Sequence, residues 1–228
     1  EVGDEITQAM QPGPGGGYWE LMLPETCPDR ALLLGMGGGT VANLLARRCP
    51  GAQIVGVERD AEVLALAREH FGLSELEQRG HLTIVYADAF VWVAEQVGEA
   101  PPSDAPDAPV APVAPVAPIA EAGERARNAD AAAHTDHYDL ICLDLFEGGR
   151  LAQGALATPF LRQIAALLAP DGTLTVNLMV TGRTPEQLHR LRRVFVVTRE
   201  LKLRGNLIAH LRLPTADEPL AGPAITAD

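Results

Sequence analysis

Carboxylates at the ends of short apolar runs are the residues of this sequence with the clearest chemical potential. Glu58, Asp88 and Asp144 each end such a run, and Glu147 follows the last of them by three residues. A carboxylate in such a place can hold ribose hydroxyls, accept a proton from an amine or hydroxyl, or bind a cationic substrate. Each acid could instead cap a helix, stabilise a loop or face solvent at a strand end.

A glycine cluster lies ahead of these acids. It runs from Gly35 to Gly39 between an apolar run and a helical pattern that starts at Thr40. Glycine allows positive φ and close approach of a ligand, and the free amides of a helix N-terminus favour anionic or polar groups. Glu58 follows about 20 positions later, where a ribose diol could be held. The pattern predicts a nucleotide or nucleoside pocket; a glycine-rich turn with nothing bound is the alternative.

The elements that must position these residues alternate between strand and helix. We expect strands near 31–35, 53–58, 82–86, 138–144 and 173–179, and helices near 40–49, 61–71, from 90, 156–168 and from 184. This order predicts an α/β fold, a three-layer Rossmann-like sandwich with a mostly parallel sheet. Alternating segments around Gly205-Asn206 predict a C-terminal antiparallel hairpin with these two residues as its turn.

The segments outside this alternation divide the 228 residues. We expect a flexible arm at 1–17, one domain at 18–212 and a flexible tail at 213–228. A Pro/Ala-rich insertion at 98–137 has no helix or strand period, and its histidines, near Asp136, are interpreted as linker residues and not as a metal site. Tyr18 and Glu20 could form a lid or pocket wall, or a short element packed on the sheet.

Charge and cysteine content limit the function classes. A formal net charge of −12 argues against a general nucleic-acid binder and fits an enzyme with a cationic substrate. Residues 183–212 carry eight Lys/Arg against two acids, which indicates a solvated face, an anionic partner's contact surface or a subunit contact, as in a homodimer.

The three cysteines lack metal-ligand spacing and predict reduced thiols of a cytoplasmic protein. No apolar run approaches membrane-spanning length, and no signal peptide is evident.

Four motifs in order resemble the class I S-adenosylmethionine-dependent methyltransferase fold, and most closely its spermidine synthase branch. They are Gly35-Met-Gly37-Gly38-Gly39, Val57-Glu58-Arg-Asp60, Ala87-Asp88 and Tyr138-Asp-Leu-Ile-Cys-Leu-Asp144. The branch carries a Gly-Gly-Gly-Asp-Gly-Gly turn, a Val-Glu-Ile-Asp stretch and an Asp-Ser-Ser-Asp-Pro catalytic loop. Its Tyr-x-Glu-Met segment is similar to Tyr18-Trp-Glu20-Leu21. The resemblance covers about residues 18–180 apart from the insertion.

The resemblance implies roles for individual residues. Asp144 and Glu147 would be the catalytic acids, with Asp144 the base that takes the amine proton. Glu58 would hold the ribose hydroxyls and Asp88 would face the adenine amino group, while Tyr18 and Glu20 would contact the acceptor. The full set implied to bind S-adenosylmethionine or its decarboxylated form is Gly35, Met36, Gly37, Gly39, Glu58, Arg59, Asp88 and Ala89.

Departures from the branch lie on the polyamine side of the site. Gly38 stands where the family has the aspartate that holds the aminopropyl amine, and Glu147 replaces a shorter Asp. Pro14 to Gly17 stand where the family has acidic residues, and its N-terminal β-hairpin domain has no counterpart in this sequence. The resemblance therefore implies that the nucleoside half of the binding site is retained and that the polyamine half is altered.

The prediction that follows is a transferase that moves a methyl or aminopropyl group to a small acceptor, such as a polyamine. Methyl transfer or a divergent spermidine synthase-like activity is favoured over authentic spermidine synthesis. Two alternatives remain: a non-catalytic nucleoside-binding module, and an NAD-dependent oxidoreductase. Thr40 in place of the last small residue of the turn, and the terminal hairpin, speak against the oxidoreductase.

Overall fold

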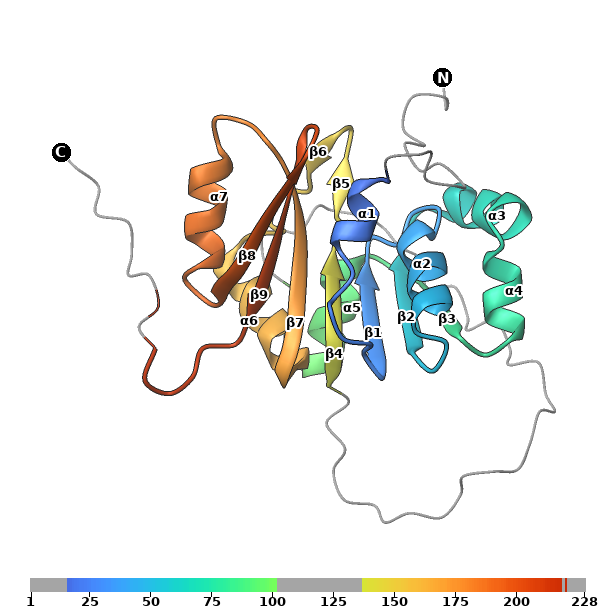
Figure 1. Cartoon of the computed structure of the whole chain (residues 1–228), viewed down its shortest axis with the longest axis horizontal. Coiled ribbons are helices and arrows are strands. Elements are labelled where there is room, and N and C mark those ends of the chain that lie inside the picture. Colours follow the sequence, from blue (N-terminus) through green and yellow to red (C-terminus); the bar gives the residue numbers. More distant parts are fainter. Residues whose placement is uncertain (1–15, 102–136, 219, 221–228) are drawn as a thin grey trace, which may run out of the picture.

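A computed structural model describes residues 16–101, 137–218 and 220 of the chain. Most of the expected arm, insertion and tail therefore lie outside the described residues. The described part places helices on both faces of a central sheet (Figure 1).

The sheet has seven strands in the order β3-β2-β1-β4-β7-β9-β8. The strands are β1 (Arg30–Leu34), β2 (Gln53–Glu58), β3 (Leu82–Tyr86), β4 (Tyr138–Leu143), β7 (Leu168–Met179), β8 (Val196–Leu203) and β9 (Asn206–Arg212). β1 pairs in parallel with both β2 and β4, and β4 pairs in parallel with β7. β9 then pairs antiparallel with β7 and β8. The predicted mostly parallel sheet with a C-terminal hairpin is confirmed.

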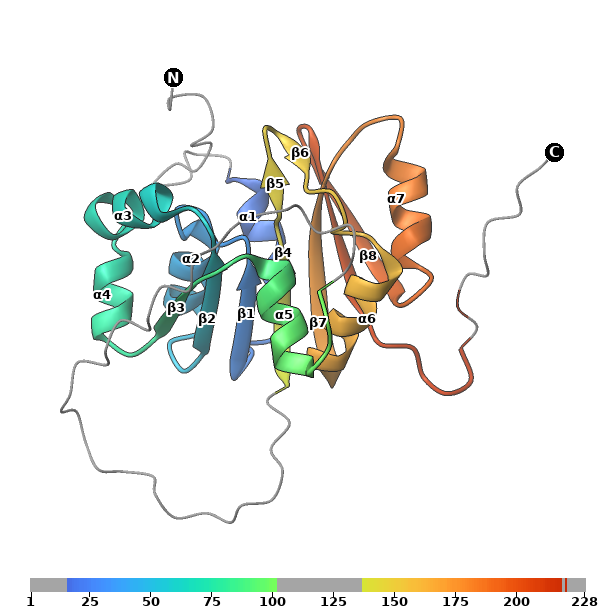
Figure 2. The ribbon, with the colours of Figure 1, turned by 180° about the vertical axis from the view of Figure 1, so that it is seen from behind.

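Helices cover the two faces of the sheet and enclose two apolar cores. The helices are α1 (Tyr18–Leu21), α2 (Thr40–Arg48), α3 (Ala61–His70), α4 (Leu73–Gln78), α5 (Ala89–Val97), α6 (Thr158–Leu167) and α7 (Thr184–Leu191). One core joins the first four helices to the sheet, and the other joins α5, α6 and α7 to the opposite face. α5 and α6 accordingly stand in front when the molecule is seen from behind (Figure 2).

Several local features differ from the prediction, and β7 begins at Leu168 and not near residue 173. α4 was not expected, and the loop after β4 contains a short antiparallel pair, β5 (Phe146–Glu147) with β6 (Arg150–Leu151). The hairpin turn is Arg204-Gly205 and not Gly205-Asn206, because Asn206 pairs with Leu203 and Met179 inside the sheet. Arg204 consequently takes the positive φ, 54°, that a turn of this kind requires.

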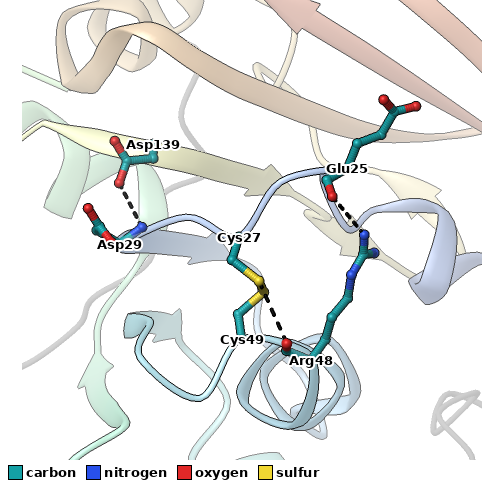
Figure 3. The surroundings of a disulfide bond; sticks show 6 residues. All are labelled: Glu25, Cys27, Asp29, Arg48, Cys49 and Asp139. Atoms are coloured by element: carbon teal, nitrogen blue, oxygen red, sulfur yellow. Dashed lines mark hydrogen bonds between the residues drawn. A yellow bond between two sulfur atoms is a disulfide. The ribbon is translucent and has the colours of Figure 1, made fainter.

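The cysteine prediction was wrong for two of the three residues. Cys27 and Cys49 form a disulfide between the segment ahead of β1 and the C-terminal end of α2 (Figure 3). Their Cα atoms lie 5.4 Å apart although 22 positions separate them in sequence. An odd cysteine count did not exclude a pair, since Cys142 is left over as a free, buried thiol. Disulfides persist in oxidising compartments, so the cysteines no longer support a cytoplasmic location.

The disulfide is one of several links that fix residues 22–29, which we name the N-terminal strap. The Asp139 carboxylate accepts hydrogen bonds from the backbone N–H of Asp29 and of Arg30, at 3.0 and 2.9 Å. Arg48 donates to the backbone oxygen of Glu25 (Figure 3). The strap therefore holds α1 at a defined place beside the sheet. Within the described residues, no helix is long and apolar enough to cross a membrane.

Candidate functional site

The predicted acids meet at the carboxyl edge of the parallel strands. β1 lies between β2 and β4, so the strand order reverses there. Glu58 ends β2, Asp144 directly follows β4, and Asp88 directly precedes α5. The backbone N–H of Asp144 donates to the Leu34 carbonyl at 2.9 Å, which joins the β4 end to the start of the glycine turn. Open α/β sheets bind ligands at this edge.

Positive φ angles shape the glycine turn. Gly35, Gly37 and Gly39 have φ values of 80°, 53° and 77°. A Cβ on Gly35 would collide with the backbone oxygen of Asp144, and one on Gly39 would collide with Leu73 of α4. The glycine at 35 is thus needed for the close approach of β1 and the Asp144 loop, as well as for its φ. Met36, within the turn, is buried with its side chain against Gly56.

Glu58 binds the turn from the adjacent strand. Its Oε2 accepts a hydrogen bond from the Gly37 N–H at 2.7 Å. Its Oε1 accepts from the N–H groups of Arg59 and Asp60, at 2.9 and 3.0 Å. Asp60 in turn caps α3 by accepting from Glu62 and Val63. The carboxylate is therefore rigidly placed beside the turn, and Oε2 retains room for a further donor such as a hydroxyl.

Asp88 caps α5, as the sequence allowed. Its Oδ1 accepts hydrogen bonds from the N–H groups of Phe90 and Val91, the second at 3.3 Å. Its Oδ2 lies 3.4 Å from the Nη1 of Arg59. Only 4% of the Asp88 side chain is exposed, so its Oδ2 is available to few groups. Capping and ligand binding use different oxygens and are compatible.

Arg59 spans the two halves of the site. Besides Asp88, its guanidinium contacts Glu147 of β5 in an ion pair. This connection between Asp88 and Glu147 through Arg59 was not predicted. Ala89, the first residue of α5, is buried beside Asp88.

Asp144 is the most perturbed acid of the site. The Tyr18 hydroxyl donates to its Oδ2 at 3.0 Å, and the Asn177 amide donates to its Oδ1 at 2.8 Å. Burial raises the pKa of Asp144 to about 6, while these two hydrogen bonds oppose that rise and the charge of Glu58 adds to it. Burial, with the neighbouring Asp144 charge, also raises the pKa of Tyr18. A carboxylate with such a pKa is suited to accept a proton near neutral pH.

The two residues of α1 that were predicted to contact the acceptor substrate lie in different environments. Tyr18 points toward Asp144, while Glu20 is exposed. Trp19 between them is buried in the core, which fixes the face that the helix presents. The structure therefore brings Tyr18, but not the Glu20 side chain, into hydrogen-bonding contact with the acids discussed above. Of the residues that the structure describes, no three His, Cys, Asp or Glu side chains gather as metal ligands would.

Comparison with known proteins bears on the fold. No family model matches the chain. It is 27% identical over 157 residues to a polyamine aminopropyltransferase of Vibrio vulnificus, which is 68% of this chain and 40% of that protein. It is 37% identical over 79 residues to a trans-aconitate 2-methyltransferase of Paracidovorax citrulli, covering 35% of this chain and 27% of that protein. The chain thus spans less than half the length of these curated relatives.

Solved structures agree on the architecture. Human methyltransferase-like protein 13 in complex with SAH superposes with a TM-score of 0.59 at 23% identity, covering 89% of this chain and 79% of that one. Spermidine synthase from Thermotoga maritima superposes with a TM-score of 0.56 at 14% identity, covering 88% and 60%. The chain has a spermidine synthase-like class I S-adenosylmethionine-dependent methyltransferase fold. Within this methyltransferase fold, the glycine turn and the four acids occupy the edge just described.

Sequence reasoning missed one residue of this methyltransferase-fold site. Asn177 lies on β7 with only 2% of its surface exposed, and it contacts Asp144 directly. Its signal was present, because an amide inside the apolar run 173–179 must find a partner when buried. Asn206, which bonds to Asn177, gave a weaker signal because its place beside a glycine indicated a turn.

Proposed function

We propose that this chain is a transferase that uses S-adenosylmethionine or its decarboxylated form and modifies a small amine. The observation that carries the proposal is the Asp144 carboxylate, held by Tyr18 and Asn177 beside the glycine turn with a pKa of about 6. The names of the relatives, an aminopropyltransferase and a methyltransferase, support the same reaction class.

The residues present fit a nucleoside. Glu58 can accept a ribose hydroxyl at Oε2, the glycine turn leaves room for close approach, and Asp88 can accept an amino hydrogen at Oδ2. When bound, the sulfonium nucleoside supplies an electrophilic carbon next to its positive sulfur. The chain's part is to orient the acceptor nitrogen toward that carbon and to exclude water.

Asp144 completes the reaction as a proton acceptor. The acceptor nitrogen forms a bond to the carbon, the carbon–sulfur bond breaks with its electron pair going to sulfur, and one N–H proton passes to the Asp144 carboxylate. Tyr18, which donates to the same carboxylate, fixes the direction of its free lone pairs. The proton leaves to solvent when the product departs.

The acceptor-side acids favour methyl transfer or a divergent aminopropyl transfer. Gly38 offers no carboxylate to an aminopropyl amine, and Glu147 is paired with Arg59. An acceptor with several ammonium groups would therefore meet fewer free carboxylates than the sequence suggested.

Calorimetric titration of S-adenosylmethionine and of its decarboxylated form into one protein sample tests the cofactor. Tighter binding of the first directs the search to methyl acceptors, and tighter binding of the second makes putrescine the first acceptor to try. Product thioether nucleoside is then measured by mass spectrometry, with Asp144→Asn as the inactive control. Binding of neither nucleoside would overturn the proposal.

A non-catalytic nucleoside-binding module is the second candidate. The observation that favours it is that the Arg59 guanidinium contacts both Asp88 and Glu147. These two carboxylates are then less available to a substrate. A protein that binds the nucleoside but yields no thioether product with any amine of a varied panel would support this candidate.

A further inference from the structure

We propose that Asn177 and Asn206 are positioning residues that keep the Asp144 carboxylate ionised and correctly oriented. Asn206 donates from Nδ2 to the Oδ1 of Asn177 at 2.9 Å, and Asn177 donates from Nδ2 to the Oδ1 of Asp144 at 2.8 Å. The chain of bonds links β9, β7 and the residue that directly follows β4. The catalytic meaning of this relay rests on the function proposed for Asp144.

Asn206 determines which end of the Asn177 amide faces the acid. A side-chain amide has one accepting and one donating end, and a flip of Asn177 would turn its oxygen toward the Asp144 carboxylate. The donor from Asn206 occupies the Asn177 oxygen and opposes that flip. Asn177 thus presents an N–H to Asp144 because Asn206 is present.

Burial explains why this arrangement has consequences for ionisation. Asn177 is 2% exposed and lies on a strand with neighbours on both sides. A buried amide without partners is costly, and here each end has one. A protonated Asp144 would offer a weaker acceptor, so the Asn177 bond favours the ionised form.

The backbone fixes the far end of the relay. Asn206 is the first residue of β9 and pairs with Met179 of β7 and with Leu203 of β8. Its side chain therefore starts from a position held by the sheet on both sides. This is also the reason that the hairpin turn lies at Arg204-Gly205 and leaves Asn206 inside the strand.

Other groups around Asp144 do not substitute for the relay. From α1, Tyr18 donates to the other carboxylate oxygen, and from β2 the negative Glu58 disfavours ionisation. On β4 itself, the buried Cys142 thiol has a raised pKa, to about 12, and remains neutral at physiological pH. Glu147 on β5 is paired with Arg59. Asn177 is thus the neutral donor on the Oδ1 side.

A pH titration of the Asp144 carboxyl carbon by NMR tests the relay without any substrate. The comparison uses wild type, Asn177→Leu, Asn206→Leu and, as a matched control, Thr175→Val. Thr175 is a buried polar residue two positions before Asn177 whose hydroxyl contacts Cys142 and not Asp144. Thermal unfolding establishes that each variant is folded.

We expect the Asp144 midpoint to rise by about one pH unit in Asn177→Leu, because a hydrogen bond to a charged group is lost. Asn206→Leu should raise it by less, and Thr175→Val should leave it unchanged. An unchanged midpoint in Asn206→Leu and in any folded Asn177→Leu would overturn the relay. If Asn177→Leu does not fold, the partly buried Asn206 carries the test alone.

The relay and the proposed transferase function can be contradicted independently of each other. If wild type binds no sulfonium nucleoside but the midpoints shift as expected, the relay stands and the transferase proposal falls. If wild type is active and the midpoints do not move, the transferase proposal stands and the relay falls. Where an acceptor is found, the acidic limb of the kcat/KM profile should shift upward with the carboxyl midpoint in Asn177→Leu.

Discussion

The raised pKa of Asp144 suits its proposed role as a proton acceptor but lowers the stability of the folded protein. Its folded pKa is about 6 against an ordinary value of 3.8, because burial disfavours its charge. The folded state therefore binds more protons than the unfolded state between those pH values, and stability falls as pH rises through that window. A buried carboxyl group with a pKa of about 6 thus weakens the protein at neutral pH.

Replacing Asp144 by Asn should stabilise the protein at pH 7.5 by as much as about 3 kcal/mol, because the buried charge is removed. The asparagine can accept from Asn177 and donate to the Tyr18 oxygen, so both neighbours keep a partner. Chemical denaturation of wild type and variant at pH 7.5 and at pH 4 measures the effect, which should nearly vanish at the lower pH. An equal gain at both pH values would contradict this explanation.

Tyr18→Phe should raise the pKa of Asp144 further, since one of its two donors is lost. If the transferase proposal holds, activity should fall several-fold at pH 6.5 and recover partly at pH 8.5. The pH–rate profile measures this against wild type.

At the scale of elements, short segments hold the site by capping and cross-linking. Asp60 caps α3 through two backbone N–H groups, and the strap carries α1 to the sheet. The strap's links also include an ion pair between Arg199 and Glu25, and α1 itself is held by a contact from the His210 ring to the Leu21 carbonyl. These links explain how a helix of four residues can place Tyr18 reproducibly.

Removing the disulfide should lower the free energy of unfolding by about 3 kcal/mol, since the bond closes a loop whose ends are 22 positions apart. A Cys27→Ser, Cys49→Ser double variant measured by urea denaturation gives the value. Reductant should destabilise wild type and leave the double variant unchanged. Equal responses of the two proteins to reductant would contradict the pairing.

The Asp60 cap is separable from the cysteine link. Asp60→Ala should cost about 1 kcal/mol by removing the acceptor for Glu62 and Val63. Urea denaturation measures the loss, and Asp60→Asn, which retains a side-chain oxygen, should restore most of it. A loss of the same size in both variants would contradict a capping role.

At the scale of the whole molecule, the full chain carries a formal net charge of −12, which gives it a net negative field. Such a field attracts cations from a distance and is screened by salt. With an active pair of substrates, the KM of a cationic amine should therefore rise between 20 and about 300 mM salt. A carboxylate-bearing acceptor of similar size should show the opposite trend, and parallel trends would argue that the field has no steering role. A homodimer stays a prediction at this scale.

The sequence by itself predicted the seven strands of the main sheet, most of the helices and the edge of the sheet at which the candidate site residues meet. Apolar runs of strand length, each followed by a glycine turn or an acid, are local patterns, and parallel strands bring such ends to one edge. The bounds of β2 and β3 were predicted to the residue. Glu58, Asp88 and Asp144 could be named for the same reason.

Only the tertiary structure decided the partners of these acids. Arg59 with Glu147, Tyr18 with Asp144, and Cys27 with Cys49 are contacts between segments separated along the chain. Local propensity carries no information on such pairs, because they depend on how strands order themselves and on where side chains meet. Asn177 illustrates this limit of sequence-based prediction. Its burial could be predicted from the apolar run of β7, but its partners depend on β4 and β9 lying on either side of that strand.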